Sequence, residues 1–137
     1  MYGDWKVAKI IHVSGKRKTA IARVTLKQGN GVVKINHRLI STVKPEALRM
    51  RIEEPMILAG DITGIDISVN VMGGGSTSQA EAARLAIARA LAKHSKKLEK
   101  VFANYDRHLL VADVRRKETS KPNRHGKARA KKQKSYR

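Results

Sequence analysis

The final 23 residues of the chain, 115–137, restrict what the rest of it can fold into. They hold 11 of the 30 lysines and arginines but one of the 11 acidic residues, Glu118, and so carry +10 of the formal net charge of +19. They include Pro122 and Gly126 and show no apolar periodicity. Because such a segment buries too little apolar surface to offset the entropy lost on ordering, we expect it to be disordered when free. The sequence therefore predicts a globular body, residues 1–114, and a long extended basic arm, residues 115–137.

The overall charge favours a polyanionic partner. With a net charge of +19 on 137 residues, the like charges repel one another and attract phosphate groups. Nucleic acid is the first candidate and an anionic membrane surface the second. No apolar run approaches the roughly 20 residues needed to cross a bilayer, and the opening residues MYGDWKVAKI lack the order of a secretory signal. The sequence has no cysteine, which excludes disulfides and thiolate metal sites. We therefore expect a cytoplasmic protein with no membrane partner.

The first third of the chain has the patterns of β-strands. Residues 5–13 are rich in valine and isoleucine, the basic stretch SGKRK (14–18) is typical of a turn, and residues 19–27 alternate apolar with mixed side chains. Gly29-Asn30-Gly31 follows, and because both residue types tolerate a positive φ, this tripeptide indicates a hairpin. Together these patterns predict a meander of three antiparallel strands.

The rest of the body combines helices and strands. The predicted elements are a helix from Pro45 that Pro55 divides into two short pieces, a strand at 64–72, helices at 76–94 and 96–105, and a strand at 109–114. A capping box, Ser76 with Gln79 or Ser78 with Glu81, is expected at the start of the longest helix.

The fold class follows from this order of elements. It predicts an α+β fold with one sheet of about four or five strands and with helices packed on one face of that sheet. The other face would carry residues such as Arg23, Lys27 and Lys34, and would be left for solvent or a partner.

No group of residues has the pattern of an active site. The five histidines show neither H-E-x-x-H nor another ligand spacing, and no aspartate is paired with a histidine at a suggestive spacing. We therefore predict no enzyme, no catalytic residue, no metal site and no cofactor.

Two turns are the main phosphate-binding candidates in the body. SGKRK places Lys16, Arg17 and Lys18 in a row where a turn has no structural need for cations, which favours phosphate contact. GGGSTSQ (73–79) joins a strand to a helix, where backbone N–H groups and the helix dipole can hold an anion. A tight turn whose glycines allow close packing explains the same residues equally well. Arg84, on the following helix, fits a solvent-facing position and a phosphate contact equally.

Five stretches of the chain occur in an order that resembles one protein family. They are SGKRKTAIARV, INHR, GGGSTSQAEAARLAIARAL, YDRHLLVADVRRKE and GKARAKKQKSYR. The combination resembles the family of the ninth protein of the small ribosomal subunit, and the ending KSYR with the short chain favours an archaeal-type member. The resemblance implies a body folded like the second domain of the fifth small-subunit protein, with a left-handed β-α-β crossover that departs from the general right-handed rule.

The resemblance also implies a function in translation. The body would bind ribosomal RNA of the subunit head beside other head proteins, and the arm would contact the anticodon stem-loop of transfer RNA in the peptidyl site. The implied transfer-RNA residues are Lys134, Ser135, Tyr136 and Arg137. The ribosomal-RNA candidates, from the resemblance and from the features above, are Lys16, Arg17, Lys18, Arg23, Gly73, Gly74, Gly75, Arg84, Arg115, Arg116, Lys117, Arg124, Lys127, Arg129, Lys131 and Lys132.

Two other functions remain open from the residues themselves. One is a free-standing nucleic-acid-binding protein of chromatin or messenger RNA, which the basic composition also fits. The other is a small-molecule kinase with residues 73–79 as its nucleotide loop. The chain is less than half the length such an enzyme usually needs, and no carboxylate stands out as a magnesium ligand, so the kinase is the weaker alternative.

Overall fold

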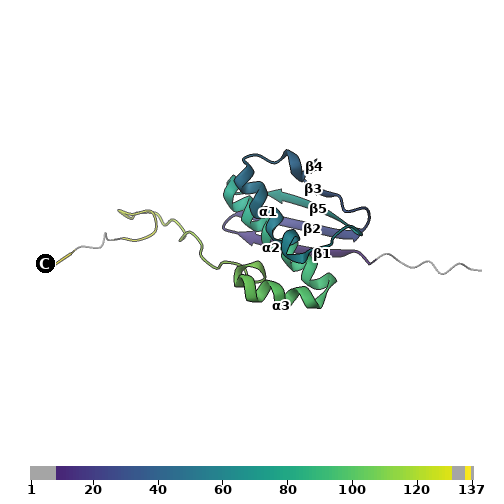
Figure 1. Cartoon of the computed structure of the whole chain (residues 1–137). Helices are drawn as coiled ribbons and strands as arrows, with labels where there is room; N and C mark the ends of the chain where they lie inside the picture. Colours follow the sequence, from purple (N-terminus) through teal and green to yellow (C-terminus); the bar gives the residue numbers. More distant parts are fainter. Residues whose placement is uncertain (1–8, 131–134, 137) are drawn as a thin grey trace, which may run out of the picture.

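The computed structural model describes residues 9–130, 135 and 136 and has the predicted α+β class (Figure 1). Its elements, in chain order, are β1 (Ile11–Arg17), β2 (Ala20–Gln28), β3 (Val33–Ile35), β4 (Arg38–Leu39), α1 (Glu46–Ala59), β5 (Ile65–Met72), α2 (Ser76–His94) and α3 (Lys96–Tyr105), with 3₁₀ turns at Ile40–Thr42 and Arg107–Leu109. Among these residues no helix is long and apolar enough to cross a bilayer.

The five strands form one mixed sheet in the order β1-β2-β5-β3-β4. β2 is antiparallel to both β1 and β5, whereas β3 runs parallel to β5. The predicted three-strand meander is therefore wrong, since β5 takes the place beside β2 that a hairpin would give to β3. The physical reason is pairing length: β5 matches β2 over eight residue pairs, whereas β3 is three residues long.

The loop at residues 29–32 is a connection rather than a hairpin turn. The backbone N–H groups of Asn30 and Val32 donate to Asp66 Oδ1 at 2.8 and 3.0 Å, and Gly31 has a φ of 84°. These bonds hold the loop against the start of β5. The chain then enters β3 on the far side of β5.

Asn36 fixes β3 beside β5 through its side chain. Its Oδ1 accepts from Val71 N at 2.8 Å and its Nδ2 donates to Val71 O at 3.2 Å, while its backbone N–H donates to Val69 O at 2.9 Å. Asn36 has a φ of 47°, so the chain turns away from the sheet here. The amide group thus continues the parallel pairing for one step after the strand ends.

Three element boundaries differ from the sequence predictions near the first turn. Residues 14–17 belong to β1 rather than to a turn, because the antiparallel pairing with β2 continues as far as Arg17 opposite Ala20. The turn is left to Lys18 and Thr19, and Lys18 takes a φ of 54°. Of the strand predicted at 5–13, residues 5–8 lie outside the described residues, and the strand itself begins at Ile11.

α1 is one continuous helix through Pro55, so the predicted division into two pieces is wrong. Pro55 is fully buried, and packing of its ring against the core offsets the missing N–H. The strand predicted at 109–114 is also wrong. A 3₁₀ turn ends at Leu109 and irregular chain follows, because the Asp106 side chain accepts from His108 N and starts a turn there.

The capping box predicted for α2 does not form. Gly75 is the N-cap, and no side chain within the described residues caps the helix. The side chain of Gln79 instead reaches back and donates to Gly73 O at 3.0 Å. Gln79 therefore closes the glycine loop onto the helix rather than pairing with a serine.

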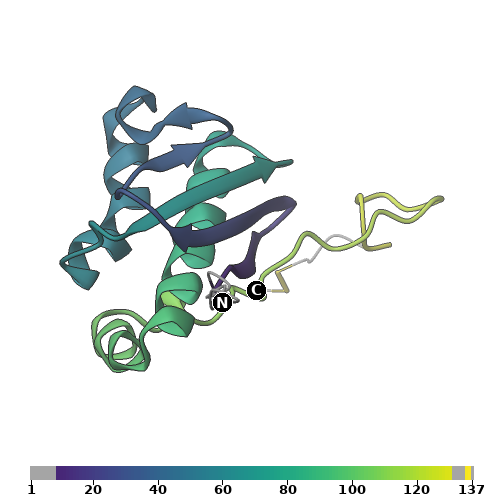
Figure 2. The same ribbon diagram turned by 90° about the vertical axis from the view of Figure 1, so that its right-hand side faces the viewer.

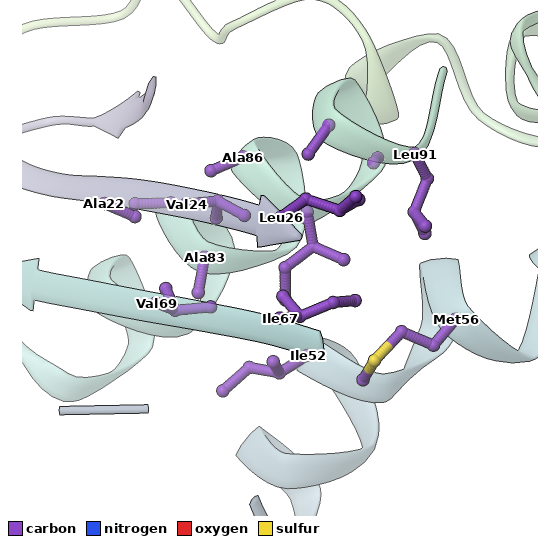
Figure 3. Packing of buried hydrophobic residues seen from close by; sticks show 14 of the residues in the cluster. Ala22, Val24, Leu26, Ile52, Met56, Ile67, Val69, Ala83, Ala86 and Leu91 are labelled. Atoms are coloured by element: carbon purple, nitrogen blue, oxygen red, sulfur yellow. The ribbon is translucent and has the colours of Figure 1, made fainter. Parts of the chain in front are cut away.

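The core lies between the sheet and α2, with α1 packed beside α2 (Figures 1 and 2). Alternate residues of β2 and β5 are buried, including Val24, Leu26, Ile67 and Val69, and they point towards the alanine-rich face of α2 (Figure 3). α1 adds Ile52 and Met56 at the end of this layer. The predicted arrangement of helices on one side of the sheet is thus present, and the other side is exposed.

Candidate nucleic-acid interface

The exposed side of the sheet carries cations from three strands. Lys16 lies on β1, Arg23 and Lys27 on β2, and Lys34 on β3, and all four are exposed because they alternate with buried residues. The acidic side chain on this side from β5 is Asp66, whose pKa is lowered by hydrogen bonds from the Val32 and Asn30 backbone. We call this surface the outer face; it is polar and basic.

The turn at Lys18 and the glycine loop 73–75 lie side by side. A Cβ on Gly73 would stand 2.7 Å from Thr19 O, and one on Gly74 would stand 3.1 Å from Ala20 N. Both glycines also have positive φ values, 76° and 63°. The packing explanation for these glycines is therefore sufficient by itself. Their backbone remains exposed, next to the exposed Lys18 and the start of α2.

Arg17 and Arg84 have partners inside the protein. The Arg17 guanidinium lies 2.7 Å from Glu81 and 3.2 Å from Asp113, and its side chain is 15% exposed. Glu81 also binds Arg51 at 2.7 Å. These pairs join β1, α1, α2 and the segment that precedes the arm. Sequence reasoning missed them because the partners are separated by 30 residues or more.

Arg84 joins α2 to α1 and α3. Its Nε pairs with Glu54, and its Nη2 lies 3.0 Å from Asp106 Oδ2. Burial by itself would lower the pKa of Arg84, but these two carboxylates raise it. The pKa of Asp106 is lowered by the His108 N–H and by Arg84. Arg84 is therefore a structural link between helices. Arg17 likewise links β1 to its neighbours, although its buried Nη1, which lies near Asp113, makes no hydrogen bond among the described residues.

Replacement of Arg84 by methionine should lower the free energy of unfolding by about 2 kcal/mol, because Glu54 and Asp106 would lose a half-buried partner. RNA affinity should fall no more than it does when any other single cation is removed. Urea denaturation and RNA titration measure the two effects. The control is Arg107→Met, which removes an exposed arginine that has no side-chain bond among the described residues. Unchanged stability with a much larger loss of RNA affinity than in the control would instead make Arg84 an RNA contact.

The described part of the arm points away from the body and is exposed (Figure 1). Residues 115–130 contain neither helix nor strand, and a turn closes where Lys121 N donates to Lys127 O at 2.9 Å. Glu118 pairs with Lys121 and Arg129 across this turn. The exposed cations here are Arg115, Arg116, Lys117, Lys121, Arg124, Lys127 and Arg129.

The predicted tip of the arm is only partly described. Ser135 and Tyr136 are exposed, and Tyr136 retains 92% of its accessible surface. The other predicted tip residues, Lys134 and Arg137, and the ribosomal-RNA candidates Lys131 and Lys132 lie outside the described residues. The structure thus brings the cations together in two places, the outer face and the arm.

Comparisons with known proteins agree with the resemblance in the sequence. The model of the family described as ribosomal protein S9/S16 matches residues 15–137, which include the whole arm. The small ribosomal subunit protein uS9 of Methanococcus vannielii is 47% identical over 133 residues, covering 94% of this chain and 99% of that protein. The uS9 protein of Methanococcus maripaludis strain C7 is 45% identical over the same shares. This chain therefore belongs to the ribosomal protein S9/S16 family.

Proposed function

We propose that this protein is a structural constituent of the small ribosomal subunit in the cytoplasm. Its body would bind ribosomal RNA of the head beside other head proteins, and its arm would extend along RNA to transfer RNA in the peptidyl site. The observation that carries the proposal is that the family match extends through the arm, where +10 of the net charge lies on residues without helix or strand among those described. Such a segment has no evident use inside a protein core.

The body would contact ribosomal RNA mainly through its outer face. Lys16, Arg23, Lys27 and Lys34 are exposed, and within the described residues the one acidic side chain near them is that of Asp66, opposite Lys27. Among the described residues this basic face carries no tryptophan, tyrosine or phenylalanine. Such a face suits phosphates and riboses better than stacked bases. The loop 73–75 with Lys18 would add a second phosphate contact, because the exposed start of α2 has a positive dipole end.

The detailed fold is part of the same proposal. β3 and β5 are parallel neighbours, and the chain between them includes α1, so they form a β-α-β unit. We infer that this unit has the left-handed crossover that the resemblance implies, and that the body has the fold of the second domain of the fifth small-subunit protein.

The arm would gain a fixed shape only on RNA. Lysines and arginines that lie along phosphates release condensed counterions, and this favourable term offsets the entropy lost on ordering. Lys117, Arg124 and Lys127 are exposed and available for such contacts. Arg129 pairs with Glu118 in the free protein, a surface pair that is weak enough for an RNA phosphate to replace it.

The tip would hold transfer RNA by shape and charge rather than by sequence. Tyr136, which is exposed, can stack on a base or ribose or donate its hydroxyl hydrogen. Arg137 offers a planar fork for bidentate phosphate binding that a lysine does not match. Lys134 and Ser135 would add one charge and one hydroxyl group to the same contact.

Deletion of Tyr136 and Arg137 tests the transfer-RNA contact. We expect dissociation of transfer RNA from the peptidyl site to become about 10-fold faster, since one stacked ring or charged pair contributes about 1–3 kcal/mol. Subunit assembly should remain intact, because the body and most of the arm are unchanged. A filter-binding assay of purified ribosomes measures dissociation. The matched control replaces both residues by serine, which keeps the chain length and should give the same defect.

If ribosomes with the deletion retain transfer RNA as long as the parent does, the tip does not contact transfer RNA as proposed. A separate result bears on the alternative of a free-standing nucleic-acid-binding protein. A ribosomal constituent remains with small subunits in sedimentation after a moderate salt wash, and a loosely bound protein does not.

A further inference from the structure

The segment that joins the body to the arm, residues 109–113, is held by three contacts. We call it the arm root. Leu109 is fully buried in the core. The guanidinium of Arg89, on α2, donates to Leu110 O at 2.9 Å and to Ser14 O on β1 at 3.2 Å. The first half of the arm root is therefore fixed to both α2 and β1.

Asp113 makes the third contact, and it faces both the body and the arm. Its Oδ2 lies 3.2 Å from Arg17 Nη1 of β1 and 2.7 Å from Arg115 Nη2 of the arm. Its Oδ1 accepts the Arg115 backbone N–H at 2.9 Å. The Asp113 side chain is 16% exposed, whereas that of Arg115 is 79% exposed. The Arg115 guanidinium, its N–H and Arg17 hold the pKa of Asp113 well below the usual range, so this carboxylate stays charged.

After Asp113, the bonds of the described arm residues no longer reach side chains of the body. Arg116 donates to the Asp113 and Arg115 carbonyls at 3.0 and 3.1 Å. Beyond Arg116, the hydrogen bonds and ion pairs of the described residues join arm residues only to one another, as in the pairs of Glu118. Asp113 is thus the last described residue that connects the arm to a side chain of the body.

We propose that Asp113 is a positioning residue that fixes the direction in which the arm leaves the body. Arg17 is itself held by Glu81, which also binds Arg51, so Asp113 is tied to a rigid set of pairs across three elements. On the arm side, Asp113 accepts from both the backbone N–H and the side chain of Arg115, which restricts the backbone at its exit. The arm would then be free to rearrange only beyond that exit.

The consequence for RNA binding rests on the proposed function. When the body is bound to ribosomal RNA, an arm that leaves it in a fixed direction would meet one path on the RNA. The effective concentration of the arm at that path would be high. An arm that swings at its root would first have to lose that orientational freedom, and its binding would weaken accordingly. Asp113 would therefore favour RNA binding by orienting the arm, even though its negative charge repels RNA phosphates.

The free protein tests the direction of the arm. The chain has no cysteine, so Lys97→Cys on α3 and Lys117→Cys on the arm provide two unique positions for spin labels. Electron–electron double resonance then measures the distance distribution between them. Asp113→Asn should broaden this distribution at least about twofold. Glu118→Gln is the matched control, because it also replaces one acid by its amide but breaks pairs within the arm alone. Circular dichroism confirms that each variant is folded.

Equal widths in the parent, the Asp113→Asn variant and the control would overturn the proposal. A broadened distribution in Glu118→Gln equal to that in Asp113→Asn would overturn it as well, since lost charge alone would then explain the effect.

RNA binding gives a second and independent readout. Both variants gain one unit of positive charge, so electrostatics alone predicts equal, slightly tighter binding for the two. We expect Asp113→Asn to bind a transcript of the small-subunit head domain about 5-fold more weakly than Glu118→Gln, while both bind polyuridine equally. Equal affinities for the head transcript would contradict a positioning role in RNA binding. Failure of the parent to prefer the head transcript over polyuridine would instead refute the proposed function and leave the spin-label result to decide the role of Asp113.

Discussion

Replacement of Gly15 by alanine should destabilise the body by about 3 kcal/mol or more, the upper end of the usual cost of overpacking. Gly15 is buried where β1 crosses α2, and a Cβ there would stand 2.6 Å from Ala82 O and 2.8 Å from Ala86 N. Both atoms belong to the helix backbone, so they cannot rotate away as a flexible side chain would. β1 or α2 must move for the methyl group to fit, and either movement separates the sheet from the helix that covers it.

The displacement caused by the methyl group should extend beyond β1, because the neighbouring residues are closely packed. Ala22, Ala82 and Ala86 are all fully buried at this crossing. Small residues on both elements set the close approach, and close-packed interiors transmit a displacement rather than absorb it. Arg17, two residues further along β1, would also be shifted relative to Glu81 and Asp113.

Urea denaturation followed by circular dichroism measures the predicted loss. Gly64→Ala is the matched control, since no described atom outside its two chain neighbours lies within 4 Å of a Cβ at Gly64 and its φ is not in the left-handed region. We expect the control to change the unfolding midpoint little. If Gly15→Ala and Gly64→Ala have the same midpoint, the close packing of β1 on α2 is not needed for stability.

Local periodicity accounts for the elements that the sequence predicted correctly. The alternation at 19–27 and 64–72 and the helical pattern at 76–94 and 96–105 all reappear as β2, β5, α2 and α3. In each, the buried side follows from residues two, three or four positions apart, which a single sequence displays directly. The strongly basic arm is equally visible, because charge content needs no knowledge of contacts.

The errors in strand order and in the use of Arg17 involve contacts between residues that are distant in sequence. The position of β3 depends on Asp66 and Asn36, which bond to residues about 35 positions away. The structural use of Arg17 depends on Glu81, 64 positions away. A pattern-based prediction treats each segment by itself, so it could describe SGKRK as a basic turn but not recognise that Arg17 has acidic partners. The sequence therefore identifies the cations of the candidate site, but it does not show which of them are free of acidic partners.

This distinction bears on how much of the RNA affinity each part of the molecule supplies. Arg17, Arg51 and Arg84 of the body bond to body carboxylates, whereas the arm has one acid, Glu118, for 11 cations. The cations of the arm can thus meet RNA phosphates at little cost in broken pairs. Those of the outer face are fewer, and they are spread over three strands.

Removal of residues 115–137 should consequently abolish most of the salt dependence of RNA binding. If roughly seven of the 11 arm cations meet phosphates, the slope of log K against log salt should become less steep by about 5 to 6, at roughly 0.7–0.9 per contact. The affinity at about 100 mM salt should fall by about 1000-fold or more. The buried core of the described residues ends at Leu109, so the shortened protein keeps every residue of that core and should fold.

A second variant separates the charge of the arm from its length. In it, all 11 lysines and arginines of the arm become glutamine, which keeps the full chain but removes the counterion release. Titration of a head-domain transcript from about 50 to 400 mM potassium chloride should give this variant the same shallow slope as the deletion. A steep slope in both variants would place the phosphate contacts on the outer face instead. A shallow slope in the deletion but not in the glutamine variant would mean that cations of the body supply the phosphate contacts, and that the arm, through its backbone and hydroxyl groups, only holds the body on the RNA.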